Sequence, residues 1–509
     1  MTPDWLGWLA LALIVLGLAL VGSLWAAGRF ARLERGKPSA MLPRTDEETT
    51  LDRLIEPLER ANPQRAGVRL VPSESEALAL RLSLARAAER SLDLMYYIWE
   101  DDLSGRLLAG EVLAAADRGV RVRMLIDDVN LIRRDPAFRA LDRHPRIEVR
   151  LFNPIRNRDR GVLRGLELLF NLLPYNRRMH NKLMIGDARL AITGGRNVGD
   201  PYFGVQKGSG VYFDDLDVLA AGAGLGSMGE LFDRFWNSGV ALPIRTLWVG
   251  KSSRLRRFRQ RLARFLDQPA NRARLAPLNL PPAEAAIDSL ALDRLRWIDG
   301  LDFLGDPPEK SLGARREGWL PESLMPLIRS AKRELRIMTP YFVPGKRGMA
   351  QLIEMARAGV EIEIITNGLG RSDSMLVYGA YRWYRPRLLA EGIRLIEAAH
   401  PDEPDTMLHA KSFIVDGERA FVGSFNFDLR SAFLNTELGV TFDDPVLIEE
   451  LTALFDAARA PRRGWHVSRD GRLLRWTRGE ETTRAEPGTN WWKRALTFCI
   501  GHLPIHRFL

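Results

Sequence analysis

The longest apolar stretch of the chain lies near its N-terminus. Trp5 to Gly28 covers 24 residues and contains no charged side chain. A helix of this length is about 36 Å long, which is enough to cross the roughly 30 Å hydrocarbon core of a bilayer. Only Asp4 precedes the stretch as a charged residue, and Arg29 and Arg35 lie in the basic flank that follows. We therefore expect a single transmembrane anchor and not a cleaved signal peptide, with the rest of the chain in the cytoplasm. A buried core helix is the alternative.

Beyond this stretch, one pattern of apolar and polar positions occurs twice. Residues 90–99 (RSLDLMYYIW) and residues 333–342 (RELRIMTPYF) each predict a short buried strand. A helix and a second, alternating strand follow, which end at Asp128 in the first copy and at Gly368 in the second. A third strand comes next, RIEVRLF in the first copy and GIRLIEA in the second. This order predicts two similar α/β units, each a mixed sheet covered by helices, related by a pseudo-two-fold axis with the active site between them.

The repeat divides the chain into five segments. They are an anchor with its basic flank (1–36), a first α/β domain (65–242), a linker (243–310), a second α/β domain (311–460) and a tail (461–509). The linker contains an Arg-rich amphipathic helix from Ser253, which we expect to pack on the body through its Leu and Phe face; binding to anionic lipid is the alternative. In the tail, Trp491 and Trp492 precede Lys493 and Arg494, a pattern that suits a membrane interface and a docked terminal helix equally.

Composition and charge narrow the class of protein. Hydrophobic residues make up 46% and charged residues 27% of the 509 residues, which is typical of a globular chain. The net charge of +10 favours anionic partners such as phospholipid head groups or nucleic acid, although a solvated Arg-rich surface gives the same charge. Cys499 is the single cysteine, so an intrachain disulfide and a thiolate metal cluster are both excluded.

The strongest chemical signal repeats with the two units. Each unit contains His-x-Lys, four residues, Asp, six residues, a pair of small residues, and then Asn after one more residue. The first unit has His180, Lys182, Asp187, Gly194, Gly195 and Asn197, and the second has His409, Lys411, Asp416, Gly423, Ser424 and Asn426. His-x-Lys on a strand places both side chains on one face, and a turn near the Asp brings the small pair and the Asn back beside them. We expect the two units to direct these side chains into one cleft, with the small residues leaving room for a phosphate.

Two histidines in one cleft supply what phosphodiester exchange requires. One neutral imidazole attacks phosphorus and forms a phosphohistidine, while the other, protonated, donates to the leaving alcohol and then acts as base for the incoming one. Lysines and asparagines stabilise charge on the non-bridging oxygens. This chemistry needs no cofactor, and no set of His, Asp and Glu in the sequence resembles a metal site. A tethered binding protein with a decayed site is an alternative, but both histidines and both lysines are present.

The two blocks resemble the signature of the phospholipase D superfamily, from about Arg65 to Asp444. The resemblance implies a bilobal α/β fold and a phosphohistidine mechanism without metal. It also implies His180 as the nucleophile and His409 as the general acid and base. The phosphate-binding residues it implies are Lys182, Lys411, Asn197, Asn426 and Ser424.

The resemblance implies supporting roles for four carboxylates. Asp187 and Asp416, within the catalytic motifs, are expected to support the structure through their own hydrogen bonds. Glu437 in NTELGV and Asp217 in FDDLDV are expected to orient the histidines. Gly195 stands where many relatives have Ser, which leaves one hydroxyl fewer in the first unit.

Finer features resemble the bacterial cardiolipin synthases. They are GGRNVGDPYFG from Gly194, GDPPEK from Gly305 and the EPGTNWW tail. That branch transfers a phosphatidyl group to the hydroxyl of phosphatidylglycerol at the inner membrane, so it implies phospholipid substrates and no nucleic acid. The phosphatidyl donor, phosphatidylglycerol or phosphatidylethanolamine, and the need for an accessory protein stay open. The alternatives are a phospholipase D that releases phosphatidic acid and a nuclease of the same superfamily.

Overall fold

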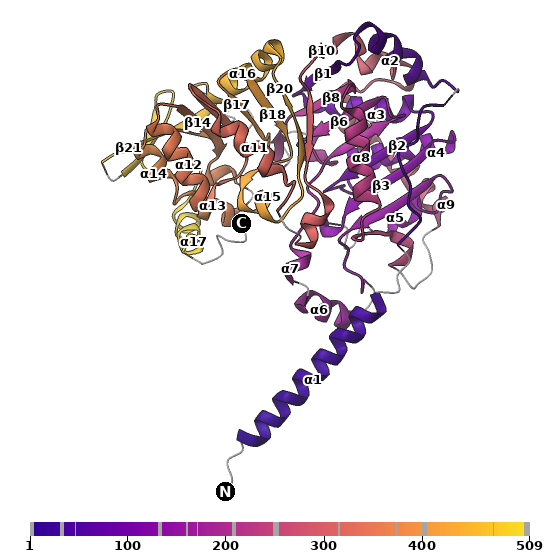
Figure 1. Ribbon diagram of the computed structural model, residues 1–509, viewed down its shortest axis with the longest axis horizontal. Coiled ribbons are helices and arrows are strands. Elements are labelled where there is room, and N and C mark those ends of the chain that lie inside the picture. Colours follow the sequence, from indigo (N-terminus) through magenta and orange to yellow (C-terminus); the bar gives the residue numbers. More distant parts are fainter. Residues whose placement is uncertain are drawn as a thin grey trace.

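Two β-sheets that face each other form the body of the protein (Figure 1). The computed structural model describes residues 5–30, 35–45, 47–130, 135–158, 161–170, 172–205, 210–247, 254–313, 316–372, 374–399, 405–471 and 473–502. The nine-stranded sheet of the first half has the order β10-β1-β8-β6-β5-β2-β3-β4-β9. The ten-stranded sheet of the second half has the order β11-β20-β18-β17-β12-β14-β15-β21-β22-β23.

The predicted internal repeat is confirmed by six equivalent strands in each sheet. In the first half they are β2 (Ser91–Tyr96), β3 (Arg121–Asp127), β4 (Ile147–Phe152), β5 (Leu183–Gly186), β6 (Leu190–Gly194) and β8 (Asp217–Gly222). In the second half they are β12 (Glu334–Met338), β14 (Glu361–Asn367), β15 (Arg394–Ala398), β17 (Ser412–Val415), β18 (Arg419–Gly423) and β20 (Leu438–Phe442). The first three of each set are parallel to one another and the last three are antiparallel. All six residues of β2 are buried, because both faces of the sheet are covered.

Helices cover the outer faces of the two sheets. On the first sheet, α2 (Thr50–Ala61), α3 (Glu74–Ala87), α4 (Leu103–Asp117) and α5 (Asp135–Leu141) share one apolar core. On the second sheet, α11 (Leu320–Arg329), α12 (Gly345–Arg357), α13 (Met375–Tyr381) and α14 (Arg385–Ala390) share another. A third core lies between the sheets and includes α8 (Leu225–Trp236) and α16 (Pro445–Arg459). Because that core holds residues from both halves, the halves pack as one body.

Further elements lie at the edges of these layers. The additional helices are α6 (Gly161–Phe170), α7 (Leu172–Tyr175), α10 (Pro269–Leu275), α15 (Leu429–Phe433) and α17 (Trp491–Gly501). The additional sheet strands are β1 (Ala66–Val71), β9 (Ala241–Pro243), β10 (Arg296–Ile298), β11 (Asp302–Gly305), β21 (Gly464–Asp470), β22 (Leu473–Arg478) and β23 (Glu481–Thr483). Two short strand pairs stand apart from the sheets, β13 (Phe342–Val343) with β19 (Phe427–Asp428) and β7 (Tyr212–Asp214) with β16 (Thr406–Leu408).

The N-terminal apolar stretch forms one helix, α1 (Trp5–Phe30), which extends away from the lower side of the body (Figure 1). Its large apolar side chains are exposed, with Trp8 at 71% and Leu18 at 68%. Within the described residues, however, no helix combines the length and apolarity needed to cross a membrane, so the predicted transmembrane anchor is not confirmed. Arg32, in the predicted basic flank, lies outside the described residues.

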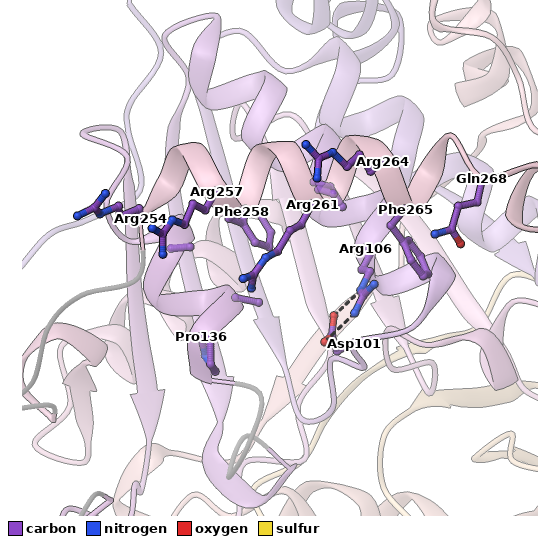
Figure 2. Close-up of a pocket in the computed structure, with 13 residues that line it drawn as sticks. Asp101, Arg106, Pro136, Arg254, Arg257, Phe258, Arg261, Arg264, Phe265 and Gln268 are labelled. Atoms are coloured by element: carbon purple, nitrogen blue, oxygen red, sulfur yellow. Dashed lines mark hydrogen bonds and ion pairs between the residues drawn. The ribbon is translucent and has the colours of Figure 1, made fainter.

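The Arg-rich helix of the linker is α9 (Leu255–Leu266), and it packs on the first half. Leu262 is buried, and Phe258 and Phe265 contact the core beneath α4 and α5. The same residues and the flanking arginines of α9, among them Arg257 and Arg261, line a groove of about 650 Å³, where Arg106 pairs with Asp101 at 2.6 Å (Figure 2). The expectation that this helix packs through its Leu and Phe face is confirmed.

Candidate active site

Each His-x-Lys pair lies in an extended segment immediately before a strand. His180 and Lys182 precede β5, and His409 and Lys411 precede β17, so the placement of these pairs within the strand itself was wrong by a few residues. The reason is that their backbone leaves the sheet to contact the other half. The following hairpins are as predicted: β5 pairs with β6, and β17 pairs with β18, which returns the small residues toward the lysines. The backbone of Gly423 donates to the carbonyl oxygen of Lys411 at 3.1 Å.

Asp187 and Asp416 close the far ends of these hairpins. Asp187 accepts hydrogen bonds from the backbone N–H groups of Glu89, Arg90 and Ser91, at 2.8–3.2 Å. Asp416 accepts three equivalent bonds at the start of β12. Both aspartates adopt positive φ, 51° and 55°, which the tight turn requires. Five extended residues at about 3.3 Å each separate Lys182 from Asp187 by roughly 16 Å, and the same spacing separates Lys411 from Asp416. Both aspartates therefore anchor the hairpin turns and do not face the histidines.

Backbone pairing between the halves brings the two histidines to the interface. Met179 bridges Thr436, and the N–H of His180 donates to the Thr436 carbonyl oxygen at 2.9 Å. On the other side β7 pairs with β16 in parallel, and the N–H of His409 donates to the Asp214 carbonyl oxygen at 2.6 Å. Each histidine is therefore held by main-chain contacts with the opposite half.

Each histidine also contacts a carboxylate of the opposite half. Glu437 Oε2 lies 2.8 Å from His180 Nδ1. Asp215 Oδ2 forms a short contact with His409 Nδ1. Because each carboxylate follows the residue that bridges the halves, Thr436 or Asp214, the two pairs obey the predicted pseudo-two-fold arrangement. Both carboxylate contacts involve Nδ1, so Nε2 is the ring nitrogen that faces away from the carboxylates; at His409 it lies 3.2 Å from Lys411 Nζ.

The structure places Asp215, and not Asp217, against a histidine, so the prediction for Asp217 was wrong. Asp217 lies in β8 and is fully buried, with its Oδ2 2.9 Å from Arg81 and 3.5 Å from Arg196. Arg81 comes from α3 and is itself buried. Two buried guanidinium groups thus neutralise Asp217, while the next acidic side chain toward the interface reaches His409.

A network of hydroxyl and backbone groups fixes Glu437. Ser424 Oγ donates to one carboxylate oxygen at 2.5 Å and Ser431 Oγ to the other at 2.7 Å. The N–H of Glu437 donates to Asp306 Oδ2 at 2.9 Å, and Lys310 pairs with the same aspartate at 2.8 Å. The GDPPEK segment therefore holds the backbone of Glu437 in place through Asp306. Ser424, predicted to bind phosphate, instead uses its hydroxyl to hold the carboxylate.

The glycine pair of the first half leaves room for Asp215. A Cβ atom at Gly195 would lie 2.0 Å from Asp215 Oδ1, and one at Gly194 would lie 2.5 Å from Asp217 Oδ1. Neither distance is compatible with a side chain. The sequence suggested that these small residues make room for a phosphate; in the structure they make room for carboxylates, which also explains why Ser does not fit at position 195.

The two lysines lie against their own histidines. Lys411 Nζ is 2.6 Å from His409 Nδ1 and 3.7 Å from Asp215 Oδ2. Lys182 Nζ donates to the carbonyl oxygen of His180 and lies 5.3 Å from the centre of the Tyr97 ring. Both ammonium groups are buried. They supply positive charge beside the imidazoles without solvent to screen it.

The two asparagines differ in their surroundings. Asn197 accepts from the N–H of Ile98 at 3.1 Å and donates to Tyr202 Oη at 2.8 Å, so its amide is already bonded within the protein. Asn426 Oδ1 is buried without a hydrogen-bond partner among the described residues. An amide oxygen accepts hydrogen bonds and a phosphate oxygen needs a donor, so the unpaired Oδ1 does not itself mark Asn426 as a phosphate ligand.

Aromatic rings that the motifs did not reveal enclose the histidines. The Tyr97 ring meets His180 edge to face with centroids 4.8 Å apart. Phe213 and Tyr202 contact His409 at 4.8 and 5.4 Å. Tyr97 and Phe213 lie within the repeated strand and the FDDLDV run, but aromatic residues in buried strands usually serve packing, so the sequence did not single them out.

Burial controls the protonation of the site. Burial lowers the pKa of His180 to about 4, with Glu437 opposing the shift and Lys182 adding to it. Burial and Lys411 lower the pKa of His409 to about 3, against the attraction of Asp215. Burial also lowers the pKa of Lys182 well below its ordinary value. Both imidazoles are therefore neutral at pH 7 in the free protein.

Burial favours protonation of the two partner carboxyl groups, but their neighbours outweigh it. For Glu437, His180 and Lys182 bring the net pKa below its ordinary value. For Asp215, Lys411 and His409 do the same. Each neutral imidazole thus faces an ionised carboxylate that accepts its Nδ1 proton and leaves a lone pair on Nε2.

Comparisons with known proteins bear on the family to which the two halves belong. The family profile described as "Cardiolipin synthase, PLD-like domain" matches residues 82–220 and 324–459, one match in each half. The chain is similar to cardiolipin synthase C of Escherichia coli (strain K12), with 36% identity over 473 residues that cover 89% of this chain and 98% of that protein. It is also similar to cardiolipin synthase A of Klebsiella pneumoniae subsp. pneumoniae, with 29% identity over 75% of this chain and 66% of that one.

A solved structure shares the fold. The crystal structure of phosphatidylserine synthase from Haemophilus influenzae Rd KW20 aligns with a TM-score of 0.55, covering 81% of this chain and 92% of that chain. Sequence identity over this alignment is 15%, so the likeness concerns architecture alone. It supports the bilobal arrangement of two similar α/β halves.

Proposed function

The chain belongs to the cardiolipin synthase, PLD-like family and is an enzyme of the phospholipase D superfamily; from this premise we propose that it makes cardiolipin by transferring a phosphatidyl group to phosphatidylglycerol. One observation carries the proposal. Two buried, neutral histidines lie at the interface, each held at Nδ1 by a carboxylate of the opposite half. That arrangement provides a nucleophile and an acid and base for one phosphorus.

In the first step, His180 Nε2 attacks the phosphorus of a donor phospholipid, phosphatidylglycerol or phosphatidylethanolamine. A P–N bond forms, the P–O bond to the head-group alcohol breaks, and His409 gives its proton to that alcohol. His409 is neutral in the free protein, so it takes up one proton from solvent when the anionic phosphodiester binds and enters this step protonated. Glu437 accepts the Nδ1–H of His180 and stabilises the positive charge that develops on the ring.

In the second step, His409 Nε2 takes the proton from a hydroxyl of phosphatidylglycerol. The oxygen attacks phosphorus, the P–N bond breaks, and His180 returns to its neutral form while His409 is again protonated. Lys182, Lys411 and the side-chain N–H groups of Asn426 stabilise the charge on the non-bridging oxygens in both steps. Protons and charges balance over the two steps, because His409 ends the cycle with the proton that it took up from solvent when the donor bound.

An apolar pocket beside Asn426 supports a lipid as substrate. It has a volume of about 690 Å³ and lies between α11, α12 and α15. Phe425 and Phe427, which flank Asn426, form part of its wall, together with Trp319 and Phe433. Arg316, Lys346 and Arg347 also line the pocket, so it combines an apolar wall for acyl chains with positive charge for an anionic head group. The exposed apolar side chains of α1 add support for action at a membrane, which we propose is the bacterial inner membrane.

The test is a lipid analysis in a bacterial host that lacks its own cardiolipin synthases. Wild-type chain and the His409→Ala variant are expressed in parallel and the lipids are extracted. Cardiolipin with the wild type alone is the expected result. If phosphatidic acid forms in place of cardiolipin, the chain hydrolyses phospholipids and does not transfer the phosphatidyl group to a lipid alcohol. If neither lipid changes, while the purified chain cleaves single-stranded DNA, the substrate class is wrong.

A further inference from the structure

The last described helix, α17, carries its polar and apolar faces the wrong way round for a helix in water. At 100° per residue, Thr497 and Gly501 lie on one face, and both are buried. The opposite face is apolar and exposed: Trp491 at 76%, Trp492 at 50%, Leu496 at 41% and Phe498 at 48%, with Ala495 and Cys499 between them. A surface helix normally buries its large apolar side chains and exposes its small polar ones. The exposed face of α17 therefore needs an apolar partner.

Close backbone contact fixes the orientation of α17. A Cβ atom at Gly501 would lie 2.7 Å from the carbonyl oxygen of Gly379 in α13, so the two glycines allow the helices to touch. Trp383 Nε1 donates to the carbonyl oxygen of Gly501 at 2.8 Å. Asn490 caps the helix by accepting from the N–H of Lys493 at 3.1 Å. The helix cannot turn its apolar face inward without breaking these contacts.

The surroundings of the apolar face indicate what covers it. Lys493 and Arg494 border the face and have no ion-pair partner among the described residues, which suits an anionic surface. In Figure 1, α17 and α1 lie on the same, lower side of the body, and α1 is itself an exposed apolar helix. Tryptophan side chains of this kind are enriched at the boundary between the hydrocarbon and the head groups of a bilayer.

We propose that α17 is a second membrane contact, which inserts its Trp491–Cys499 face into the interface of a bilayer that contains anionic lipid. Together with α1, it fixes the side of the bilobal body that faces the lipid. The inference concerns where the body lies and does not depend on the phosphoryl chemistry proposed above.

Cys499 offers a direct test because it lies on the exposed face and is the single cysteine of the chain. The full chain is labelled there with a fluorophore and reconstituted into vesicles of phosphatidylethanolamine and phosphatidylglycerol. A matched control carries Cys499→Ser and Glu450→Cys, which moves the label to α16 on the opposite side of the body in Figure 1. We expect a nitroxide on the lipid to quench the label at position 499 at least about twofold more strongly than the label at position 450.

Substitutions on the same face sharpen the test. The pair Trp491→Gln and Trp492→Gln should reduce the lipid quenching of the Cys499 label to the level of the control. Leu473→Gln, an equally exposed apolar position on β22, should leave it unchanged. Equal quenching at positions 499 and 450 would overturn the proposal. So would a label at 499 that is shielded from aqueous iodide in a dimer without lipid, because a second copy would then cover the face. Cardiolipin formation is measured in the same vesicles, so a failure of this contact is distinguishable from a failure of the proposed reaction.

Discussion

Asp215 and Asp217 lie two residues apart, but Asp215 contacts His409 and Asp217 neutralises buried Arg81. Replacing each aspartate in turn by asparagine distinguishes the catalytic role from the structural one. Asp217→Asn removes the charge that neutralises Arg81, whose side chain is 1% exposed and 2.9 Å away. Breaking a buried ion pair by removing one partner costs about 3–5 kcal/mol. At about 2–4 °C per kcal/mol for a domain of this size, the midpoint of thermal unfolding should fall by roughly 6–20 °C.

Asp215→Asn leaves that buried pair intact and removes the carboxylate at His409. The midpoint of unfolding should fall in this variant as well, because the buried ammonium of Lys411, 3.7 Å from Asp215, loses its carboxylate partner. Turnover should fall about 100-fold or more, because His409 loses the group that orients its ring and stabilises its charge.

The assay combines thermal unfolding in detergent with the rate of cardiolipin formation in mixed micelles, both measured on the two variants and the wild type. The rate is taken at a temperature where all three are folded, so that lost stability does not count as lost catalysis. Full turnover in Asp215→Asn, or an Asp217→Asn variant that unfolds with the wild type yet has lost its activity, would refute the assignment of the two roles.

Three further outcomes are expected. Gly195→Ala and Gly195→Ser should both lower turnover, because a Cβ atom at this position would lie 2.0 Å from Asp215 Oδ1. Steady-state rates of cardiolipin formation check this, and a wild-type rate in Gly195→Ala would contradict it. Burial lowers the pKa of His180 to about 4 and that of His409 to about 3, below the ordinary 6.5. The unfolded state thus binds more protons below pH 6.5, and stability should fall as pH drops from 6.5 toward 4. A double His→Ala variant should show a flatter dependence in pH-resolved unfolding; an identical slope would count against the low pKa values. Asp187→Asn, which keeps the turn but weakens three backbone hydrogen bonds, should lower the unfolding midpoint and leave the pH–rate profile in place.

The sequence predicted the repeated fold because its signals are local. Strands such as β2 and β14 are short runs of apolar residues, and each is followed by the same helix and strand in both halves. The spacing within each motif block also predicted the hairpins that end at Asp187 and Asp416, because a turn of fixed length follows a strand of fixed length.

The sequence could not predict which buried charged side chains pair with each other over long distances along the chain. Nothing near Asp217 indicates that Arg81, 136 residues earlier, will be buried against it, and so the run of aspartates offered no reason to prefer Asp215. The use of Gly195 likewise depends on a carboxylate that returns from another strand. The charge-free stretch Trp5–Gly28 correctly predicted the helix α1. Membrane crossing depends on more than the absence of charge, and the predicted transmembrane anchor is not confirmed.

The most direct test of the account is to trap the covalent intermediate. Wild-type chain and the His180→Ala and His409→Ala variants are mixed with a phospholipid donor that carries radioactive phosphorus, quenched within one turnover and digested, and the labelled peptide is identified. The account predicts phosphatidyl label on His180 in the wild type, none in His180→Ala, and transfer of that label into cardiolipin when phosphatidylglycerol is added. Label on His409, or cardiolipin made at the normal rate by His180→Ala, would contradict it.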